Sequence, residues 1–200
     1  MSPSVHVPWP SIENFAHARR TLAALGAVRV FSKVKLHGTN AAVRIDPDGT
    51  VTCQSRNQDV APGAGGTGHF GMALWVEANA DAFRTLAQPN GPVILYGEWA
   101  GPGINQGDAV SRIPEKTFFV FSVQVPWVDG NPRRLSEWYG EYVERHLGGL
   151  GGRLRAIPPP DNYTEVNFAD PIATEAYLER LDALVAHVGE RDPYVYATFG

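Results

Sequence analysis

The sequence is short of lysine, of cysteine and of long apolar runs. Of its 17 basic residues only three are lysines, Lys33, Lys35 and Lys116. Its one cysteine, Cys53, cannot form a disulfide within the chain, which favours a reducing, cytoplasmic environment. No apolar run approaches the ~20 residues of a membrane-spanning helix, and the first residues lack the basic start and apolar core of a signal peptide. We therefore expect a cytoplasmic protein without a membrane partner.

Positive charge is in deficit as well. The 200 residues carry a formal net charge of −4, and 44% of them are hydrophobic. That apolar content excludes general disorder and is enough for the core of one domain spanning residues 1–200. The acidic balance argues against a large surface that follows a phosphate backbone.

The few lysines point to one segment of the chain. Arginine can replace lysine as a surface charge, but it stays protonated in proteins and so cannot serve as an amine nucleophile. Two of the three lysines lie two residues apart, at positions 33 and 35. In a strand such a pair shares one face. Lys35 and its neighbours are therefore the first candidates for chemistry.

Alternating and periodic segments predict an α+β fold. Strand-like character is found in residues 27–35, 41–45, 50–55, 92–99 and 117–125, and residues 46–49 (DPDG) predict a hairpin turn. Helical spacing extends over residues 72–88, 135–147 and 171–188. This order predicts mostly antiparallel sheets with helices packed on them.

Residues 35–40 (KLHGTN) follow one predicted strand and precede another. A lysine at a strand end, beside a glycine that lets the backbone approach a ligand closely, can act as a covalent nucleophile. The alternative is a solvated lysine in a β-turn. The short motif alone does not decide between the two.

Four segments in order resemble the motifs of the covalent nucleotidyltransferase superfamily. Residues 35–40 resemble motif I, K-x-[DH]-G, residues 55–57 (SRN) motif Ia, residues 95–101 (LYGEWAG) motif III and residues 118–123 (FFVFSV) motif IIIa. The histidine in the third place of motif I, His37, resembles the motif of the type-2 RNA ligases in particular. DNA ligases and capping enzymes usually carry aspartate at this position. The resemblance implies an α+β adenylation domain of the ligase and capping-enzyme type, which is similar to ATP-grasp domains.

The resemblance implies an ATP-dependent RNA ligase that works through a lysyl-AMP intermediate. Lys35 would attack the α-phosphate of ATP, and the adenylate would pass to an RNA 5′-phosphate before a 3′-hydroxyl displaces AMP. The attacking amine must be neutral, and free lysine is protonated at neutral pH. Burial, neighbouring cations such as Lys33 and Arg56, or a bound Mg²⁺ or Mn²⁺ ion would favour the neutral amine.

The same resemblance assigns roles near the nucleophile. His37 would be catalytic, and both His37 and Asn40 would act on phosphates in the steps after lysine adenylation. Leu36 would belong to the nucleotide site, and Arg56 would contact a phosphate. For His37 the alternative is a structural or solvated histidine, which is what a lone histidine usually is.

Two further residues would hold the nucleoside. Glu98 would accept hydrogen bonds from the ribose hydroxyls, and its alternative is an exposed carboxylate at a strand end. Phe118 would stack on the adenine, because aromatic side chains stack on bases. Its alternative is a core aromatic, and alternation along the strand puts Phe119 and Phe121 on the other face.

The pattern breaks near the end of the sequence. The family continues with motif IV, a Glu-Gly followed by aliphatics, and with motif V, two lysines separated by one residue. No lysine follows Lys116, and residues 193–200 (PYVYATFG) are similar to the segment that runs into motif IV. We expect a domain cut before its last catalytic strands and without the family's C-terminal RNA-binding domain. Such a chain would bind ATP weakly and adenylate poorly or not at all.

Three functions stay open at this point. The first is an RNA ligase of RNA end joining or repair, acting on 5′-phosphate and 3′-hydroxyl ends, whole or completed by a second polypeptide. The second is a non-catalytic nucleotide- or RNA-binding remnant. The third, a DNA ligase or capping-type enzyme, is disfavoured by His37.

Overall fold

The computed structural model describes residues 6–10, 15–31, 35–63, 68–105, 109–127, 131–135, 138–158 and 163–188. The chain divides into two compact units. The larger unit consists chiefly of Met1–Trp9 and Lys35–Pro159, and the smaller unit of Pro10–Val34 and Pro160–Thr198. Lys33 and residues 193–200 lie outside the described residues.

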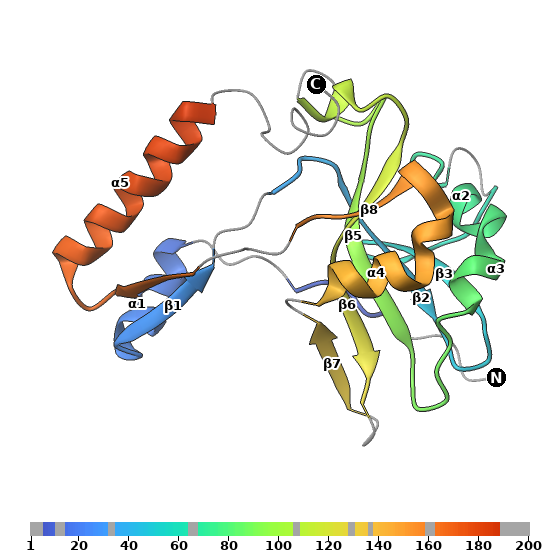
Figure 1. Ribbon diagram of the computed structural model, residues 1–200, viewed down its shortest axis with the longest axis horizontal. Coiled ribbons are helices and arrows are strands. Elements are labelled where there is room, and N and C mark those ends of the chain that lie inside the picture. The colour runs from blue at the N-terminus through green and yellow to red at the C-terminus, as the bar shows by residue number, and fades with distance from the viewer. Residues whose placement is uncertain are drawn as a thin grey trace. The chain divides into compact units, whose positions relative to one another are not determined.

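A seven-stranded sheet forms the framework of the larger unit (Figure 1). Its order is β4-β3-β2-β5-β6-β7, and β8 also pairs with β6. All neighbours are antiparallel except β6 and β8, which are parallel. The predicted α+β class with mostly antiparallel strands is therefore confirmed. The strands are β2 (Thr39–Ile45), β3 (Val51–Ser55), β4 (Asp59–Val60), β5 (Val93–Ala100), β6 (Thr117–Pro126), β7 (Pro132–Leu135) and β8 (Leu154–Ala156).

The predicted hairpin joins β2 to β3. The backbone N–H of Asp46 donates to the carbonyl of Thr50 at 2.9 Å, and that of Gly49 donates to the carbonyl of Asp46 at 2.9 Å. Gly49 has a φ of +81°, a conformation that glycine adopts without steric cost. The DPDG sequence therefore sets the register of β2 against β3, which carries motifs I and Ia into neighbouring strands.

Three helices of the larger unit pack on one face of its sheet. They are α2 (Met72–Ala78), α3 (Ala80–Arg84) and α4 (Tyr139–Leu147), and short 3₁₀ turns occupy Ala109–Arg112 and Gly148–Arg153. Their buried side chains join those of the sheet in one core cluster, which includes Trp75, Phe83, Tyr139, Leu95, Trp99 and Phe118. Burial of this aromatic and aliphatic surface is the main source of the unit's stability.

Two predicted helices differ from the observed ones. Residues 72–88 form two helices, interrupted at Asn79, whose side-chain amide donates to the carbonyl of Trp75 at 2.7 Å. Asparagine side chains compete in this way for helical backbone groups. The helix predicted over 135–147 begins at Tyr139, because Leu135 belongs to strand β7, where it pairs with Val123 of β6. The strand predicted over 27–35 is described only as far as Phe31.

Gly97 allows an irregular contact between β5 and β6. The register of the two strands shifts between Tyr96 and Gly97, as in a β-bulge. A Cβ atom on Gly97 would lie 2.4 Å from the carbonyl oxygen of Phe119 and 2.5 Å from the ring of Phe118. Only glycine lets the Phe118 ring lie over the β5 backbone at this point.

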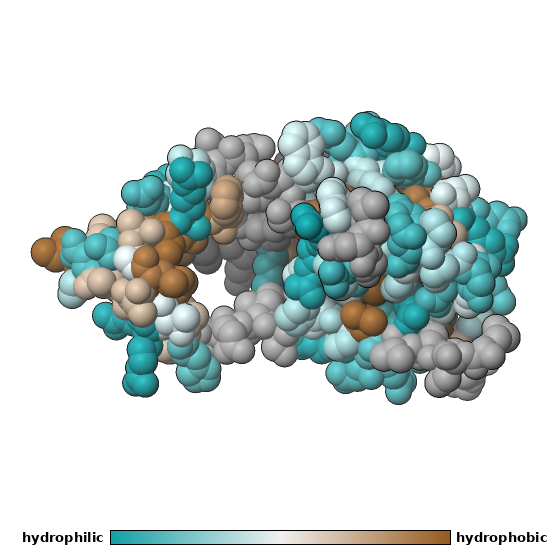
Figure 2. All heavy atoms as spheres, turned by 90° about the horizontal axis from the view of Figure 1, so that it is seen from below, coloured by the Kyte–Doolittle hydropathy of each residue, from teal (hydrophilic) through white to brown (hydrophobic). Residues whose placement is uncertain are grey.

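The smaller unit has few buried side chains. It contains α1 (Phe15–Ala24), β1 (Ala27–Phe31), β9 (Tyr163–Asn167) and α5 (Pro171–Val188), with β1 and β9 paired antiparallel. Phe168 contacts the rings of Phe15 and Tyr177, with centroids 5.6 and 6.1 Å away. Leu25 and Ile172 stay 64% and 79% exposed, and Figure 2 shows brown, apolar surface gathered on this unit.

The described part of the chain contains no helix that is both long enough and apolar enough to span a membrane.

Candidate active site

The motif I segment, residues 35–40, is held by contacts on both sides. Leu36 is buried, with 1% of its surface exposed, and so anchors the segment. A Cβ atom on Gly38 would lie 2.7 Å from the carbonyl oxygen of Trp99, so glycine is needed for the segment to lie against β5. The side-chain amide of Asn105 donates to the carbonyls of His37 and Gly38 at 2.7 and 2.8 Å.

His69 holds the same segment at its other end. Its Nε2 lies 2.9 Å from the carbonyl oxygen of Asn40, to which the ring donates a hydrogen bond. Burial lowers the pKa of His69, and the bond to Asn40 partly opposes this shift. The next residue, Phe70, is tied down as well, because its carbonyl accepts hydrogen bonds from Lys116 Nζ at 2.9 Å and Trp99 Nε1 at 3.3 Å.

A row of functional side chains crosses the sheet beside this segment. Asn40 of β2 pairs with Glu98 of β5, Glu98 pairs with Phe119 of β6, and Phe119 pairs with Arg155 of β8. Directly paired residues project from the same face of a sheet. Asn40, Glu98, Phe119 and Arg155 therefore form one row, which we call the polar row.

The adjacent row projects from the opposite face. Thr39 pairs with Trp99, Trp99 with Phe118, and Phe118 with Leu154. Trp99, Phe118 and Leu154 all belong to the core cluster under the helices. We call Thr39, Trp99, Phe118 and Leu154 the core row.

Glu98 is the electrostatic centre of the polar row. Burial raises the pKa of its carboxyl group from 4.5 to about 7, while the positive charges of Lys35 and Arg56 act in the opposite direction. Lys35 precedes β2 and Arg56 follows β3, so charges from two segments act on one carboxyl group of β5. A strongly raised carboxyl pKa beside specific charged partners is a mark of functional sites.

The comparisons with known proteins show the family and the fold of the chain. The family model described as RNA ligase matches residues 28–193, a span that includes parts of both units. The chain belongs to the RNA ligase family. The comparison with curated proteins found no match.

Solved RNA ligase structures share the fold. An arginine-to-alanine variant of the Naegleria gruberi RNA ligase with ATP and Mn superposes with a TM-score of 0.58 at 15% identity, covering 84% of this chain and 46% of that chain. A lysine-to-methionine variant of the same ligase, with AMP and Mn, gives a TM-score of 0.55 at 14% identity, covering 83% and 45%. This RNA ligase family chain thus spans about half the length of those ligases.

The predicted site residues are only partly brought together. Asn40 and Glu98 are neighbours, and the charges of Lys35 and Arg56 reach Glu98. The Lys35 side chain is exposed, so burial, one of the causes considered for a neutral amine, does not operate there. His37 and Arg56 are exposed as well.

Phe118 is not part of the polar row. It is fully buried in the core and faces Trp75, with ring centroids 6.3 Å apart. Its predicted stacking on adenine stays a prediction. Phe119, which pairs directly with Glu98, is fully buried as well. Alternation along β6 separates the two rings correctly, but it does not tell which face Glu98 shares.

Sequence reasoning missed three further residues around the site. Arg155 enters the polar row because β8 runs parallel to β6, a pairing between segments distant in sequence. Asn105 and His69 hold the motif I backbone from loops, and neither stands in a recognisable motif. No sequence signal available in a single chain would have found them.

No metal site is built by the described residues alone. Among them, no three histidine, cysteine, aspartate or glutamate side chains come together as ligands for an ion. Glu98 is the single carboxylate of the polar row. A divalent ion is therefore not assigned to protein ligands in this part of the chain.

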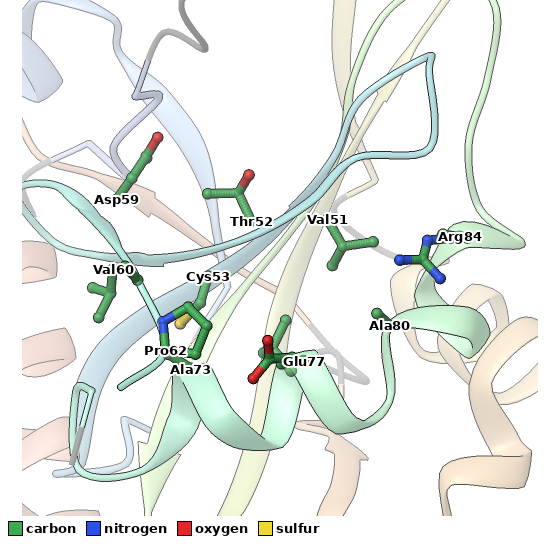
Figure 3. A pocket seen from close by; sticks show the side chains of 12 residues that line it. Val51, Thr52, Cys53, Asp59, Val60, Pro62, Ala73, Glu77, Ala80 and Arg84 are labelled. Carbon is green, nitrogen blue, oxygen red and sulfur yellow. The ribbon is translucent and has the colours of Figure 1, made fainter. Parts of the chain in front are cut away.

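A cavity of about 430 Å³ lies elsewhere, between the β3–β4 edge and helices α2 and α3 (Figure 3). Its lining contains none of the predicted site residues. Cys53 is buried there, and desolvation raises the pKa of its thiol to about 12, so it is not a thiolate at neutral pH. The cavity is lined by none of the residues of the polar row.

Proposed function

We propose that this protein is the adenylation part of an ATP-dependent RNA ligase and that Lys35 carries the AMP. The observation that carries the proposal is the pairing of Asn40 with Glu98, which unites motifs I and III, with the charges of Lys35 and Arg56 acting on Glu98. The Glu98 carboxyl group is partly buried and lies within reach of both positive charges. Membership of the RNA ligase family supports the reaction class.

The proposed chemistry has three balanced steps. The neutral amine of Lys35 attacks the α-phosphorus of ATP, a P–N bond forms, the bond to the bridging oxygen breaks, and pyrophosphate leaves while the amine loses a proton. An oxygen of the RNA 5′-phosphate then takes the AMP from Lys35, which regains a proton. Finally the 3′-hydroxyl attacks the activated 5′-phosphorus, loses its proton and expels AMP.

The residues around Lys35 have distinct roles in this proposal. Arg56 holds a phosphate of ATP by charge-assisted hydrogen bonds. Asn40 and His37 act on phosphates after lysine adenylation, and Leu36 fixes the segment within the nucleotide site. Each of these roles follows from the resemblance of residues 35–40 and 55–57 to the ligase motifs.

The nucleoside is held by the polar row. Glu98, when ionised, accepts hydrogen bonds from the ribose hydroxyls. Phe119 adjoins Glu98 in the polar row, whereas Phe118 belongs to the core cluster, and both rings are fully buried. We assign the stacking role to Phe119 on its pairing with Glu98 alone. Arg155, beyond Phe119, adds positive charge to the same face.

The substrates follow from the proposed reaction. ATP enters as its complex with Mg²⁺ or Mn²⁺, so that the ion arrives on the phosphates. The second substrate is RNA with 5′-phosphate and 3′-hydroxyl ends. We further propose that residues 1–200 form one adenylation domain, because the family match runs through both units.

Covalent labelling tests the nucleophile. We expect incubation with α-labelled ATP and Mg²⁺ to give a weak label that survives denaturation in the wild type, because no lysine follows Lys116 to supply motif V. Lys35→Arg, which keeps the charge but cannot deprotonate, should abolish the label. Nicked RNA and nicked DNA duplexes should then be compared, with sealing expected only for RNA.

The other outcomes separate the alternatives. No label but saturable ATP binding would make the chain a nucleotide-binding remnant. A label that appears only after addition of a polypeptide with motifs IV and V would make it one half of a split ligase. Labelling that persists in Lys35→Arg would overturn the assignment of the nucleophile.

A further inference from the structure

The N-terminal segment, residues 6–9, lies across the same face of the sheet as the polar row. Val7 and Trp9 pack against the small apolar cluster of Ala42, Ile94 and Tyr96, whose members alternate along β2 and β5 with residues of the core cluster. The Tyr96 hydroxyl donates to the carbonyl of Val7 at 3.2 Å, and the Trp9 ring lies 5.1 Å from that of Tyr96. The segment is therefore fixed on the sheet rather than extended into solvent.

His6, at the start of this segment, reaches the motif Ia turn. Its Nε2 lies 3.2 Å from the carbonyl oxygen of Arg56, and its Nδ1 lies 3.3 Å from Asp59 Oδ1. Both partners are acceptors, so each contact is a hydrogen bond when the ring nitrogen that faces it carries the hydrogen. The His6 side chain is only 21% exposed, which limits competition from water.

Asp59 is itself held in place. The side-chain amide of Gln54, a fully buried residue of β3, donates to Asp59 Oδ1 at 2.7 Å. Gln54 and Asp59 are also direct partners in the β3–β4 pairing. The contact between His6 and Asp59 therefore ties the N-terminal segment to a fixed point of the sheet.

The hydrogen bonds that close the turn between β3 and β4 do not include the backbone carbonyl of Arg56, which is contacted by His6 instead. Ser55 closes the turn, because its backbone N–H and its hydroxyl both donate to the carbonyl of Gln58, at 2.8 and 3.0 Å. The Arg56 carbonyl takes no part in this closure, and its contact with His6 comes from a residue 50 positions earlier. His6 thus fixes the peptide unit from which the Arg56 side chain extends.

We propose that His6 is a positioning residue for Arg56, fixing the backbone of the motif Ia turn so that the guanidinium meets the phosphates of ATP during adenylation of Lys35. This inference rests on the proposed function. His6 touches neither substrate nor nucleophile in it. The hydrogen bond to the Arg56 carbonyl carries the effect, and the contact with Asp59 orients the ring.

A matched pair of variants separates the two contacts of His6. The amide nitrogen of glutamine takes the place of Nε2, so His6→Gln keeps a donor toward Arg56. The amide nitrogen of asparagine takes the place of Nδ1, so His6→Asn keeps the contact with Asp59 and loses the one with Arg56. Both variants are uncharged, which removes net charge as a cause of any difference.

Single-turnover adenylation at several ATP concentrations measures the effect. We expect His6→Asn to lower the rate constant divided by the ATP half-saturation concentration about 5–30-fold, while His6→Gln stays within about threefold of the wild type. In an Arg56→Ala background His6→Asn should cause no further loss, because the group that it positions is gone. Equal rates for His6→Asn and His6→Gln would overturn the proposal. So would a loss of rate from His6→Asn that is as large in the Arg56→Ala background as in the wild type.

Amide hydrogen exchange separates this proposal from the proposed function. Exchange in residues 55–58 should be faster in His6→Asn than in His6→Gln or the wild type. A wild type that never forms lysyl-AMP would refute the proposed function while leaving the exchange comparison informative. Unchanged exchange in His6→Asn would refute the positioning role even if Lys35 is labelled normally.

Discussion

The polar row and the core row are neighbours in sequence and project from opposite faces of the sheet, and within the polar row Phe119 is fully buried. Each residue of one row is followed or preceded by a residue of the other, yet Trp99 and Phe118 are fully buried under helices whereas Asn40 and Glu98 are only partly buried. The same four strands thus stabilise the fold through one face and present candidate chemistry on the other. The effect of a substitution on stability or on function therefore depends on the face of the sheet from which the side chain projects, and two adjacent residues differ in this respect.

The largest effect should come from the core row. Trp99→Ala removes a fully buried side chain that contacts Trp75 at a ring distance of 5.4 Å, and we expect it to lower the free energy of unfolding by about 3–5 kcal/mol. Urea denaturation measures this loss. The neighbouring Glu98→Gln should not destabilise the protein at pH 7, and equal losses for the two variants would contradict the division into rows.

A smaller effect should come from the titration of Glu98. Its pKa is about 7 in the folded chain against 4.5 in the unfolded chain, so the folded state binds the extra proton between these values. Stability should therefore fall as pH rises from about 4.5 to 7, by about 2–3 kcal/mol for a shift of this size, and level off above it.

The control for this titration is Glu98→Gln, which cannot ionise. Unfolding of both proteins should be followed from pH 4 to pH 8. The difference in stability should grow in favour of Glu98→Gln as pH rises. A difference that is constant with pH would show that the Glu98 carboxyl group is not desolvated.

The smallest expected effect is a difference in ATP affinity between substitutions of the adjacent residues Phe118 and Phe119. Phe119→Leu removes an aromatic face from the polar row, and we expect it to weaken ATP binding about 5–30-fold, since stacking of a base contributes about 1–3 kcal/mol. Phe118→Leu should change ATP affinity by less than about twofold and lower stability by less than about 1.5 kcal/mol. Calorimetric titration measures the ATP affinity of each variant, and thermal unfolding measures its stability. A larger loss of ATP affinity in Phe118→Leu than in Phe119→Leu would restore Phe118 as the stacking residue.

The described part of the smaller unit has no counterpart of the buried, helix-covered sheet face that stabilises the larger unit. Among its described residues Val166, Phe168 and Thr174 are buried, and α1 has no buried residue. Large apolar side chains such as Leu25 and Ile172 remain exposed. With so little apolar surface removed from water, this unit contributes less to stability than the larger one.

Local patterns predicted much of the fold. The DPDG turn and its two flanking strands are where the sequence puts them, because turn chemistry and alternation act over a few residues. Strand β6 and helix α5 also follow their predicted segments. The break at Asn79 was missed, because helical spacing alone does not show that the asparagine side chain bonds to the carbonyl of Trp75. Strand β7 was missed because it depends on pairing with β6, a contact made outside the predicted segment.

The candidate site was predicted in its parts rather than in its arrangement. Lys35, Arg56 and Glu98 stand in motifs that a single chain displays. The pairing of Phe119 with Glu98 could not be predicted, because it depends on the register of β6 against β5 and on the bulge at Gly97.

By itself the sequence determined the class of fold and the identity of the reactive groups, because side-chain chemistry and periodicity are local properties. Only the tertiary structure decided which phenylalanine adjoins Glu98, that Arg155 lies in the same row, and that His6 reaches the motif Ia turn. Strand pairing joins residues that are far apart along the chain, and shifting a register by one residue exchanges the two faces of a strand.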